Sequence, residues 1–155
     1  MFKSIFLPII AVAGFIVLVG LLSQGKLIKE KSKSIKIDTT EINIEVAKSN
    51  EEKSKGLSNR ISLDENSGMI FVFSKNSKPV FWMKDTKIPL DIIWINDNKI
   101  IGIDKNVQPE PNVVDSKLKK YQSPFEVDYV LEVNAGFSDK NNIKLDQTIS
   151  GLEQL

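Results

Sequence analysis

Residues 81–97 constrain the fold of this chain more than any other stretch of its sequence. Two apolar runs, 80–83 and 92–95, flank a short polar break that ends at Pro89. Proline cannot donate a hydrogen bond to a neighbouring strand, so the second strand must begin at or after this residue. Apolar side chains at every position of 92–95 would lie on both faces of a sheet, which predicts a strand in its interior.

The rest of the chain supplies more strands and only short helices. Runs of apolar or alternating residues predict strands in 42–46, 69–73, 100–103, 127–133 and 148–149. Asp97-Asn98 has the composition of a tight hairpin turn. Ser49 lies three residues before Glu52, which is the spacing of a capping box, so a short helix is expected from Asn50 and should end at Gly56.

Together these segments predict an α+β fold. We expect a compact, mostly antiparallel sheet, curled or closed into a small barrel, with one or two short helices. The second helical turn would begin near 134–137. Residues 106–123 are polar, contain Pro109 and Pro111, and predict a long loop of the kind that is often functional.

An uncharged apolar segment precedes the predicted domain. Residues 5–22 follow a short tail, 1–4, and would span about 27 Å as a helix, close to the thickness of a bilayer's hydrocarbon core. A buried helix would need a polar face, which this segment lacks. We therefore expect a single transmembrane helix. The alternative is a cleaved signal, because small residues near Gly25 offer a processing site and the domain would then be secreted.

A basic linker, residues 23–36, is expected to connect the membrane segment to a single globular domain, residues 37–155. The linker holds five lysines, whereas the chain from Ile37 onward has 15 basic and 19 acidic residues. A mildly acidic domain argues against nucleic-acid binding. The linker lysines either contact anionic lipid or form a solvated spacer.

Orientation is judged from two opposing signals. A short tail followed by one apolar segment is typical of an export signal, which favours an extracytoplasmic domain. The lysines after the segment favour the opposite orientation by the positive-inside tendency. We expect the domain to be extracytoplasmic.

The sequence contains no histidine and no cysteine. This excludes Ser-His-Asp and Cys-His catalysis and leaves only carboxylate, Lys, Tyr or Ser/Thr chemistry. The usual ligands of zinc, haem and iron–sulfur clusters are missing as well. We therefore expect no metal and no cofactor, and we favour a protein that is not an enzyme.

The polar break after the first apolar run is the main candidate for a ligand site. Trp82 presents a large apolar surface, and Lys84, Asp85 and Thr86 follow where the strand should end. An aromatic surface beside a cation suits a small anionic ligand with a flat or apolar body. The alternative is that the aromatic residues belong to the core and that Lys84 is a solvated strand end.

Arg60, the only arginine of the chain, and Asp91 form a second candidate. A guanidinium grips a carboxylate through two parallel hydrogen bonds, in a ligand or in a structural ion pair. We favour a structural pair between Arg60 and some acid of the domain.

Scattered acids support a different class of function. Asp91, Asp104, Glu110 and Asp115 lie in or near the 106–123 loop, and two of them would make a hydrolase or lyase if they met in a cleft. Carboxylate pairs of that kind are about 5–10 Å apart. The spacing of these acids along the chain marks no such pair.

Several motifs of the chain, in order, resemble the domain of unknown function 192 family. They are Gly56-Leu57 with Arg60, residues 68–73, Phe81-Trp82-Met83-Lys84-Asp85-Thr86, residues 88–95, Tyr121-Gln122-Ser123, residues 129–136 and residues 143–149. The resemblance runs from about residue 40 to the C-terminus. It implies a compact α+β domain that is often exported or membrane-anchored, and it implies no established activity.

The chain departs from the family pattern at three places. Ser58, Asp85 and residues 108–111 stand where the family usually has Met, Asn and a Pro-Cys pair. The resemblance therefore implies no thiol chemistry here.

The function expected from the sequence is a membrane-tethered, extracytoplasmic binding or accessory domain. Its candidate ligand is a small anion or a peptide, and its membrane contact is made through residues 5–22. The carboxylate hydrolase or lyase is the alternative, and an interaction module that uses exposed sheet edges is a third reading.

Overall fold

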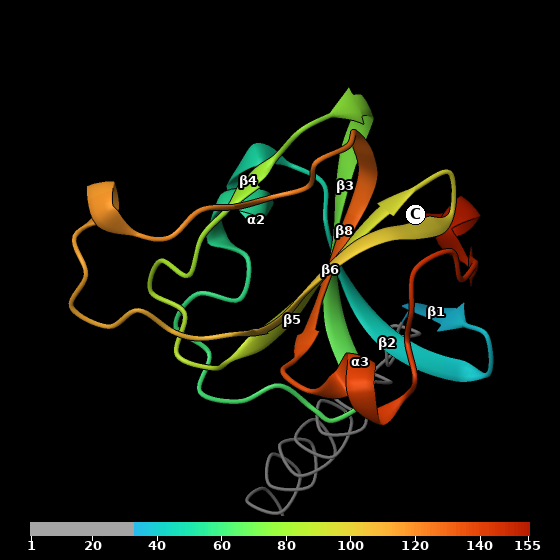
Figure 1. The fold of residues 1–155 in the computed structure, drawn as a ribbon, viewed down its shortest axis with the longest axis horizontal. Coiled ribbons are helices and arrows are strands. Elements are labelled where there is room, and N and C mark those ends of the chain that lie inside the picture. The colour runs from blue at the N-terminus through green and yellow to red at the C-terminus, as the bar shows by residue number, and fades with distance from the viewer. Residues whose placement is uncertain (1–32) are drawn as a thin grey trace, which may run out of the picture. The chain divides into compact units, whose positions relative to one another are not determined.

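Short apolar runs separated by turns become strands, and in the computed structural model, which describes residues 33–155, they form one curled sheet and a small ribbon (Figure 1). The elements are β1 (Lys33–Ile37), β2 (Thr40–Ala47), α2 (Asn50–Lys55), β3 (Ser67–Ser77), β4 (Val80–Phe81), β5 (Leu90–Asn96), β6 (Lys99–Val107), the 3₁₀ turn η1 (Asp115–Lys117), β7 (Tyr121–Gln122), β8 (Val127–Asn134), α3 (Phe137–Lys140), β9 (Ile149–Ser150) and the 3₁₀ turn η2 (Leu152–Gln154).

The main sheet has seven strands in the order β6-β5-β8-β3-β2-β1-β9, and β4 pairs with β7 in a separate ribbon. Only β2 and β3 run parallel within this described part of the chain, so the prediction of a mostly antiparallel α+β domain is confirmed.

Strand β5 lies in the interior of the sheet, as its sequence predicts. Every residue from Leu90 to Ile95 is buried, and the strand pairs with β6 on one side and with β8 on the other. Asp97 and Asn98 connect it to β6 with φ angles of 46° and 60°. A type I′ hairpin turn needs positive φ at both positions, which Asp and Asn tolerate better than most residues.

Alternating side chains along β5 and β8 divide the interior into two cores. Ile93 and Leu131 join a core that the C-terminal segment covers, whereas Ile92, Trp94 and Val130 face a second core. Residues after α2 and around β4 and β7 pack on the second core. It is this second core that borders the candidate site.

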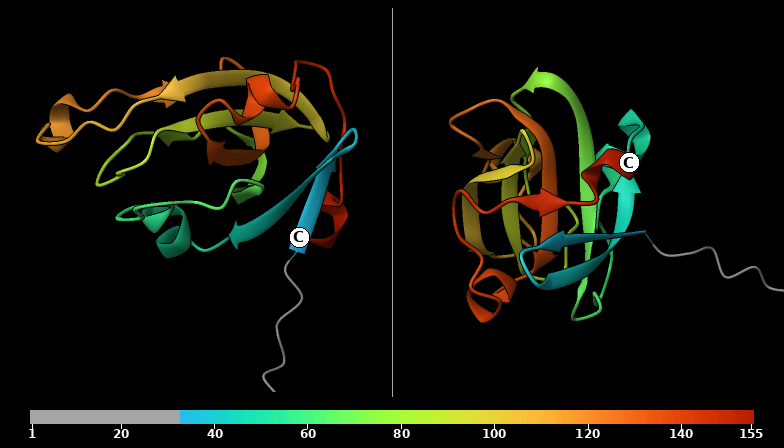
Figure 2. Two further views of the ribbon diagram at one scale, coloured as in Figure 1. Left: turned by 90° about the horizontal axis from the view of Figure 1, so that it is seen from below. Right: turned by 90° about the vertical axis from the view of Figure 1, so that its right-hand side faces the viewer.

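The sheet curls into a half-barrel, which Figure 2 shows from two directions. The segment before β9 connects the two ends of the sheet through backbone hydrogen bonds. Ile100 donates from its amide to the Gln147 carbonyl (3.1 Å), and Ile149 donates to the Asn98 carbonyl (2.8 Å). Because β9 then pairs with β1, the C-terminal segment links both ends of the sheet.

The short helices begin and end where their capping residues predict. The Ser49 hydroxyl accepts from the Glu52 amide (3.1 Å), and the Glu52 carboxylate accepts from the Ser49 amide (2.8 Å). These reciprocal bonds form the capping box that starts α2. The amides of Ser49 and Lys48, which both donate to the Glu52 carboxylate, lower the pKa of Glu52. Gly56 ends the helix with a φ of 46°.

Two predicted boundaries are wrong. Residues 33–36, expected as linker, belong to β1, because Ile35 and Ile37 alternate with polar residues and are both buried. The strand expected over 80–83 ends at Phe81. Trp82 then turns outward, because the chain leaves its pairing with β7 after a two-residue ladder.

The predicted membrane segment, residues 5–22, lies outside the described residues, as do the tail 1–4, the cleavage region near Gly25 and most of the linker. Within residues 33–155, no helix is both long enough and apolar enough to cross a bilayer.

Candidate functional site

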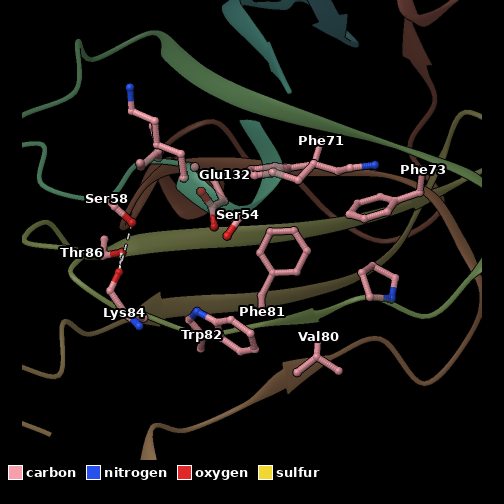
Figure 3. Close-up of a pocket in the computed structure, with 15 residues that line it drawn as sticks. Ser54, Ser58, Phe71, Phe73, Val80, Phe81, Trp82, Lys84, Thr86 and Glu132 are labelled. Atoms are coloured by element: carbon pink, nitrogen blue, oxygen red, sulfur yellow. Dashed lines mark hydrogen bonds between the residues drawn. The ribbon is translucent and has the colours of Figure 1, made fainter. Parts of the chain in front are cut away.

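A cavity of about 220 Å³ lies between α2 and the aromatic residues of β3 and β4 (Figure 3). Phe71, Phe73 and Phe81 form its apolar wall, and Glu132 of β8 lies at its base. Lys53 and Lys55 of α2 and Lys84 after β4 also line it. The cavity therefore combines an apolar wall, one buried carboxyl group and lysine side chains, a combination typical of small-molecule sites.

Local sequence features build one side of the cavity. The capping box fixes the start of α2, and Gly56 ends it directly beside Phe71. A Cβ atom at Gly56 would lie 3.3 Å from the ring atom Cζ of Phe71, and the backbone there has positive φ. Only glycine satisfies both conditions without strain, so the chain turns closely past the aromatic wall.

The wall is a cluster of perpendicular rings centred on Phe81. Its ring centroid lies 5.0 Å from that of Phe71, 6.2 Å from that of Phe73 and 5.6 Å from that of Trp94, with interplanar angles of 70–87°. Edge-to-face contacts of this kind each add about 0.5–1.5 kcal/mol beyond burial. The wall is thus held in a fixed shape.

Glu132 is the most unusual residue of the cavity. It is 6% exposed, its β-sheet neighbours in register are Met69 and Ile92, and its carboxyl group points into the cavity (Figure 3). Burial raises the pKa of Glu132 to about 8, because an apolar environment disfavours the ionised form. The group is therefore mostly a neutral carboxylic acid at pH 7.

Three of the residues predicted from the sequence lie at this cavity: Trp82, Lys84 and Thr86. Trp82 is 47% exposed, so the alternative that it belongs to the core does not hold. Lys84 forms an exposed ion pair with Asp115, which raises the pKa of Lys84. The hydroxyls of Thr86 and Ser58 both donate to the Lys84 carbonyl, at 3.3 and 3.2 Å, and hold this segment in place.

Asp85 lies beside the cavity rather than in its lining. It is exposed, adopts a positive φ of 55°, and its carbonyl accepts from the Asn59 amide (2.8 Å). Aspartate is one of the few non-glycine residues that tolerate this backbone region. Its role is to turn the chain between Lys84 and Thr86.

Arg60 and Asp91 do not line the cavity and do not pair with each other. Arg60 forms a bidentate ion pair with Glu45, so the favoured structural interpretation is correct. The hydrogen bonds of this pair lower the pKa of Glu45 and raise that of Arg60.

Asp91 is fully buried, whereas a residue that grips a ligand would have to be accessible to it. Its carboxylate accepts three backbone amide hydrogen bonds, from Asn106 (2.8 Å), Gly136 (3.1 Å) and Ser138 (2.9 Å). Both oxygens of Asp91 are thus engaged inside the fold, and the structure does not bring this predicted site residue to the cavity.

The other acids near the 106–123 loop also have protein partners. Glu110 accepts from the Lys119 amide at 3.1 and 3.2 Å, Asp115 pairs with Lys84, and Asp104 accepts from the Trp94 indole (2.7 Å). Among residues 33–155, no cluster of three or more acids is arranged to hold a metal ion.

Glu132 is not among the site residues predicted from the sequence. Alternation along β8 places it on the same face as Asp128 and Val130, and the second core covers that face. One signal was available, since Glu132 stands between Leu131 and Val133 in a strand that is apolar on both sides. An acid in such a run is buried more often than an alternating pattern suggests.

The fold and the cavity define a class: a small α+β half-barrel domain with an aromatic-walled pocket beside its capped helix. Within this class the chain belongs to the domain of unknown function 192 family, described as "Uncharacterized ACR", whose model matches residues 33–151. The resemblance stated from the sequence is confirmed.

Two solved structures are similar to this chain. One is a protein of unknown function from Novosphingobium aromaticivorans DSM 12444, with 28% sequence identity and a TM-score of 0.68 over 76% of this chain and 83% of that chain. The other is a putative transcription regulator from Sinorhizobium meliloti 1021, with 28% identity and a TM-score of 0.65 over 72% of this chain and 82% of that chain. No curated protein gives a significant match.

Proposed function

We propose that this protein is a membrane-tethered binding domain that holds a small ligand in the cavity between α2, β3 and β4. One observation carries the proposal: an aromatic-walled cavity of about 220 Å³ with a buried carboxyl group at its base. Ligand sites are typically concave and apolar with a few polar groups that orient the ligand. Its small volume of about 220 Å³ favours a small molecule over a peptide strand, which would need a long groove or a free sheet edge.

A ligand screen by thermal shift tests this proposal. Small aromatic and aliphatic acids, amides and amines raise the melting temperature if they bind the folded state. The variant Trp82→Ala should reduce this rise because it removes part of the wall. Phe125→Ala is the matched control, since Phe125 is an exposed aromatic residue (63%) outside the cavity. Equal shifts in both variants would contradict the assignment of the cavity.

The proposal places the domain outside the cytoplasm, anchored by residues 5–22. The support is the uncharged apolar run after a short N-terminal tail. A reporter enzyme that works only outside the cytoplasm, fused after Leu155, should be active and should remain with the membrane fraction. An inactive reporter would overturn the location, and activity in the soluble fraction would indicate cleavage near Gly25.

We do not propose the carboxylate hydrolase or lyase. That function would need two acids free to act on a substrate, whereas Asp91, Glu110 and Asp115 hold backbone amides or a lysine. We therefore treat these three acids as structural residues of the loop and the sheet end.

A further inference from the structure

Glu132 is buried without a protein partner for its carboxyl group. It is 6% exposed, and no side-chain hydrogen bond or ion pair within residues 33–155 includes its carboxyl oxygens. These oxygens border the cavity rather than being sealed in the core, because within the same residues only the Ser138 Oγ atom is both fully enclosed and without a partner. Asp91 provides the contrast, because its equally buried carboxylate accepts three backbone amides. Glu132 thus contributes nothing to holding the backbone, and its carboxyl group points into the cavity instead (Figure 3).

The protonation state of Glu132 decides what it can recognise. Because burial raises its pKa to about 8, the neutral acid predominates at neutral pH. A neutral carboxyl group carries an O–H donor, which an ionised carboxylate lacks. A ligand that meets Glu132 at pH 7 can therefore place an acceptor atom against its O–H, an arrangement that an ionised carboxylate would repel.

The charged groups around the cavity select the same kind of ligand. Lys53 and Lys55 of α2 and Lys84 after β4 line it, whereas the neighbours of Glu132 on β3 and β5 are the apolar residues Met69 and Ile92. The ammonium group of Lys53 donates to the Val72 carbonyl (3.1 Å) and lies 4.9 Å from the ring centroid of Phe73. Asp115 offsets the charge of Lys84, so Lys53 and Lys55 supply the net positive charge that attracts an anion and repels a cation beside the neutral acid.

We infer that Glu132 is the specificity-determining residue of this cavity, and that as a neutral acid it donates a hydrogen bond to the carboxylate of a small, flat organic anion. The inference rests on the proposed function, because it names the ligand class of the same cavity. The apolar body of the ligand would lie against Phe81 and Trp82. A hydrogen bond from a neutral acid to a carboxylate is charge-assisted and therefore stronger than one between two neutral groups.

Three probes that share a phenyl ring and are similar in size separate the ligand classes: benzoate, benzamide and benzylamine. Each is added to the full-length protein labelled with fluorotryptophan, and fluorine NMR follows the two tryptophans. Trp82 lines the cavity, whereas Trp94 is buried and bonded to Asp104, so its signal reports whether the fold is intact. We expect benzoate to shift the Trp82 signal at the lowest concentration, and benzylamine to shift it least.

The second arm varies pH and residue 132. Raising the pH from 7 to 9 ionises Glu132, so the affinity for benzoate should fall about tenfold in the wild type. Glu132→Gln keeps a donor that cannot ionise, and it should bind benzoate with the same affinity at both pH values. Glu132→Leu removes the donor and should weaken binding at least tenfold at pH 7. Glu126→Gln, on an exposed glutamate outside the cavity, should behave as the wild type.

The failures of the two proposals are distinguishable. If benzylamine binds more tightly than benzoate, or if benzoate affinity is unchanged by pH and by Glu132→Leu, the cavity binds ligands but the role of Glu132 is wrong. If none of the three probes moves the Trp82 signal, the proposed function and this inference both fail.

Discussion

Glu132 and Asp91 are both buried acids of the sheet, and their different surroundings give them opposite roles. Asp91 meets three backbone amides, which occupy both of its carboxyl oxygens and fix the chain at the ends of β6 and β8. Glu132 meets apolar neighbours, so it retains its proton and stays available to a ligand. At the scale of residues, the number of nearby donors separates a structural acid from a candidate recognition group.

The raised pKa of Glu132 makes the stability of the protein depend on pH. Below about pH 4.5 Glu132 is protonated in both the folded and the unfolded protein, so its raised pKa does not lower the stability there. As the pH rises from there to about 8, the unfolded chain ionises while the folded protein does not, so stability falls. We expect Glu132→Gln to remove this fall, and its advantage over the wild type to grow by roughly 3 kcal/mol between pH 5 and pH 8. Urea unfolding at several pH values measures the free energy of unfolding of both proteins. If the two plots of this free energy against pH are parallel, the prediction is contradicted.

Removing the carboxylate of Asp91 should destabilise the fold strongly. Asp91→Ala leaves three amide groups without their acceptor in a buried region, which we expect to cost roughly 3–5 kcal/mol. Asp91→Asn keeps one acceptor oxygen and should cost less. Urea unfolding of both variants tests this prediction. Asp128→Asn is the comparison, because Asp128 is half-buried and accepts a single backbone amide, that of Asp97. Wild-type stability in Asp91→Ala, together with altered ligand binding, would restore Asp91 as a site residue.

At the scale of elements, α2 is too short to be stable alone and depends on its cap. Six residues make fewer than two helical turns, and isolated helices of this length are unstable in water. The capping box and the packing of Leu57 below the helix hold it against the aromatic wall. The shape of the cavity therefore depends on the start of one short helix.

We expect Ser49→Ala to lower the free energy of unfolding by about 1 kcal/mol, because it removes one of the two reciprocal capping bonds. It should also weaken ligand binding, since α2 forms one side of the cavity. Glu51→Ala, within the same helix but outside the capping box, should change either property much less. Chemical unfolding and the fluorine NMR titration measure the two effects. An unchanged midpoint in Ser49→Ala would show that tertiary packing alone holds α2.

The hairpin between β5 and β6 depends on two residues with positive φ. Asn98→Val should destabilise the protein by about 1–2 kcal/mol, because a β-branched residue is strained at a φ of 60°. Asn98→Gly should be nearly neutral or slightly stabilising. Thermal unfolding compares them, and similar melting temperatures for both variants would mean that the turn adopts another geometry.

At the scale of the whole molecule, closure of the half-barrel depends on β1 and β9, the first and last strands of the described residues. β1 lies between β2 and β9, and it contributes Ile35 and Ile37 to the first core. The C-terminal segment in turn bonds to the start of β6. The domain thus begins inside the range that the sequence suggested as linker.

A shortened protein that begins at Ser32 should unfold cooperatively on heating, whereas one that begins at Asp38 should not. The shorter chain lacks β1, so β9 loses its partner and the first core is exposed to water. Circular dichroism and urea unfolding make the comparison. Equal stability of the two proteins would show that β1 is dispensable and that the domain begins at residue 37, as predicted from the sequence.

Local signals in the sequence determined several of the strands, turns and helices of this protein. Apolar runs, Pro89 and the Asp97-Asn98 turn predicted the interior hairpin, and the Ser49–Glu52 spacing predicted α2. Trp82, Lys84 and Thr86 were also correctly placed together, because residues this close in sequence cannot separate far in space. Each of these features depends on contacts within a few residues.

Only the tertiary structure decided which acid faces the cavity. Strand alternation assigns Glu132 to one face of β8, but whether that face meets water depends on α2, β3 and β4, which lie far away in the chain. The partners of Arg60 and Asp91 are likewise 15 to 47 residues distant. A buried acid owes its charge and its role to the dipoles and apolar groups that surround it, and those are brought together only when the sheet curls.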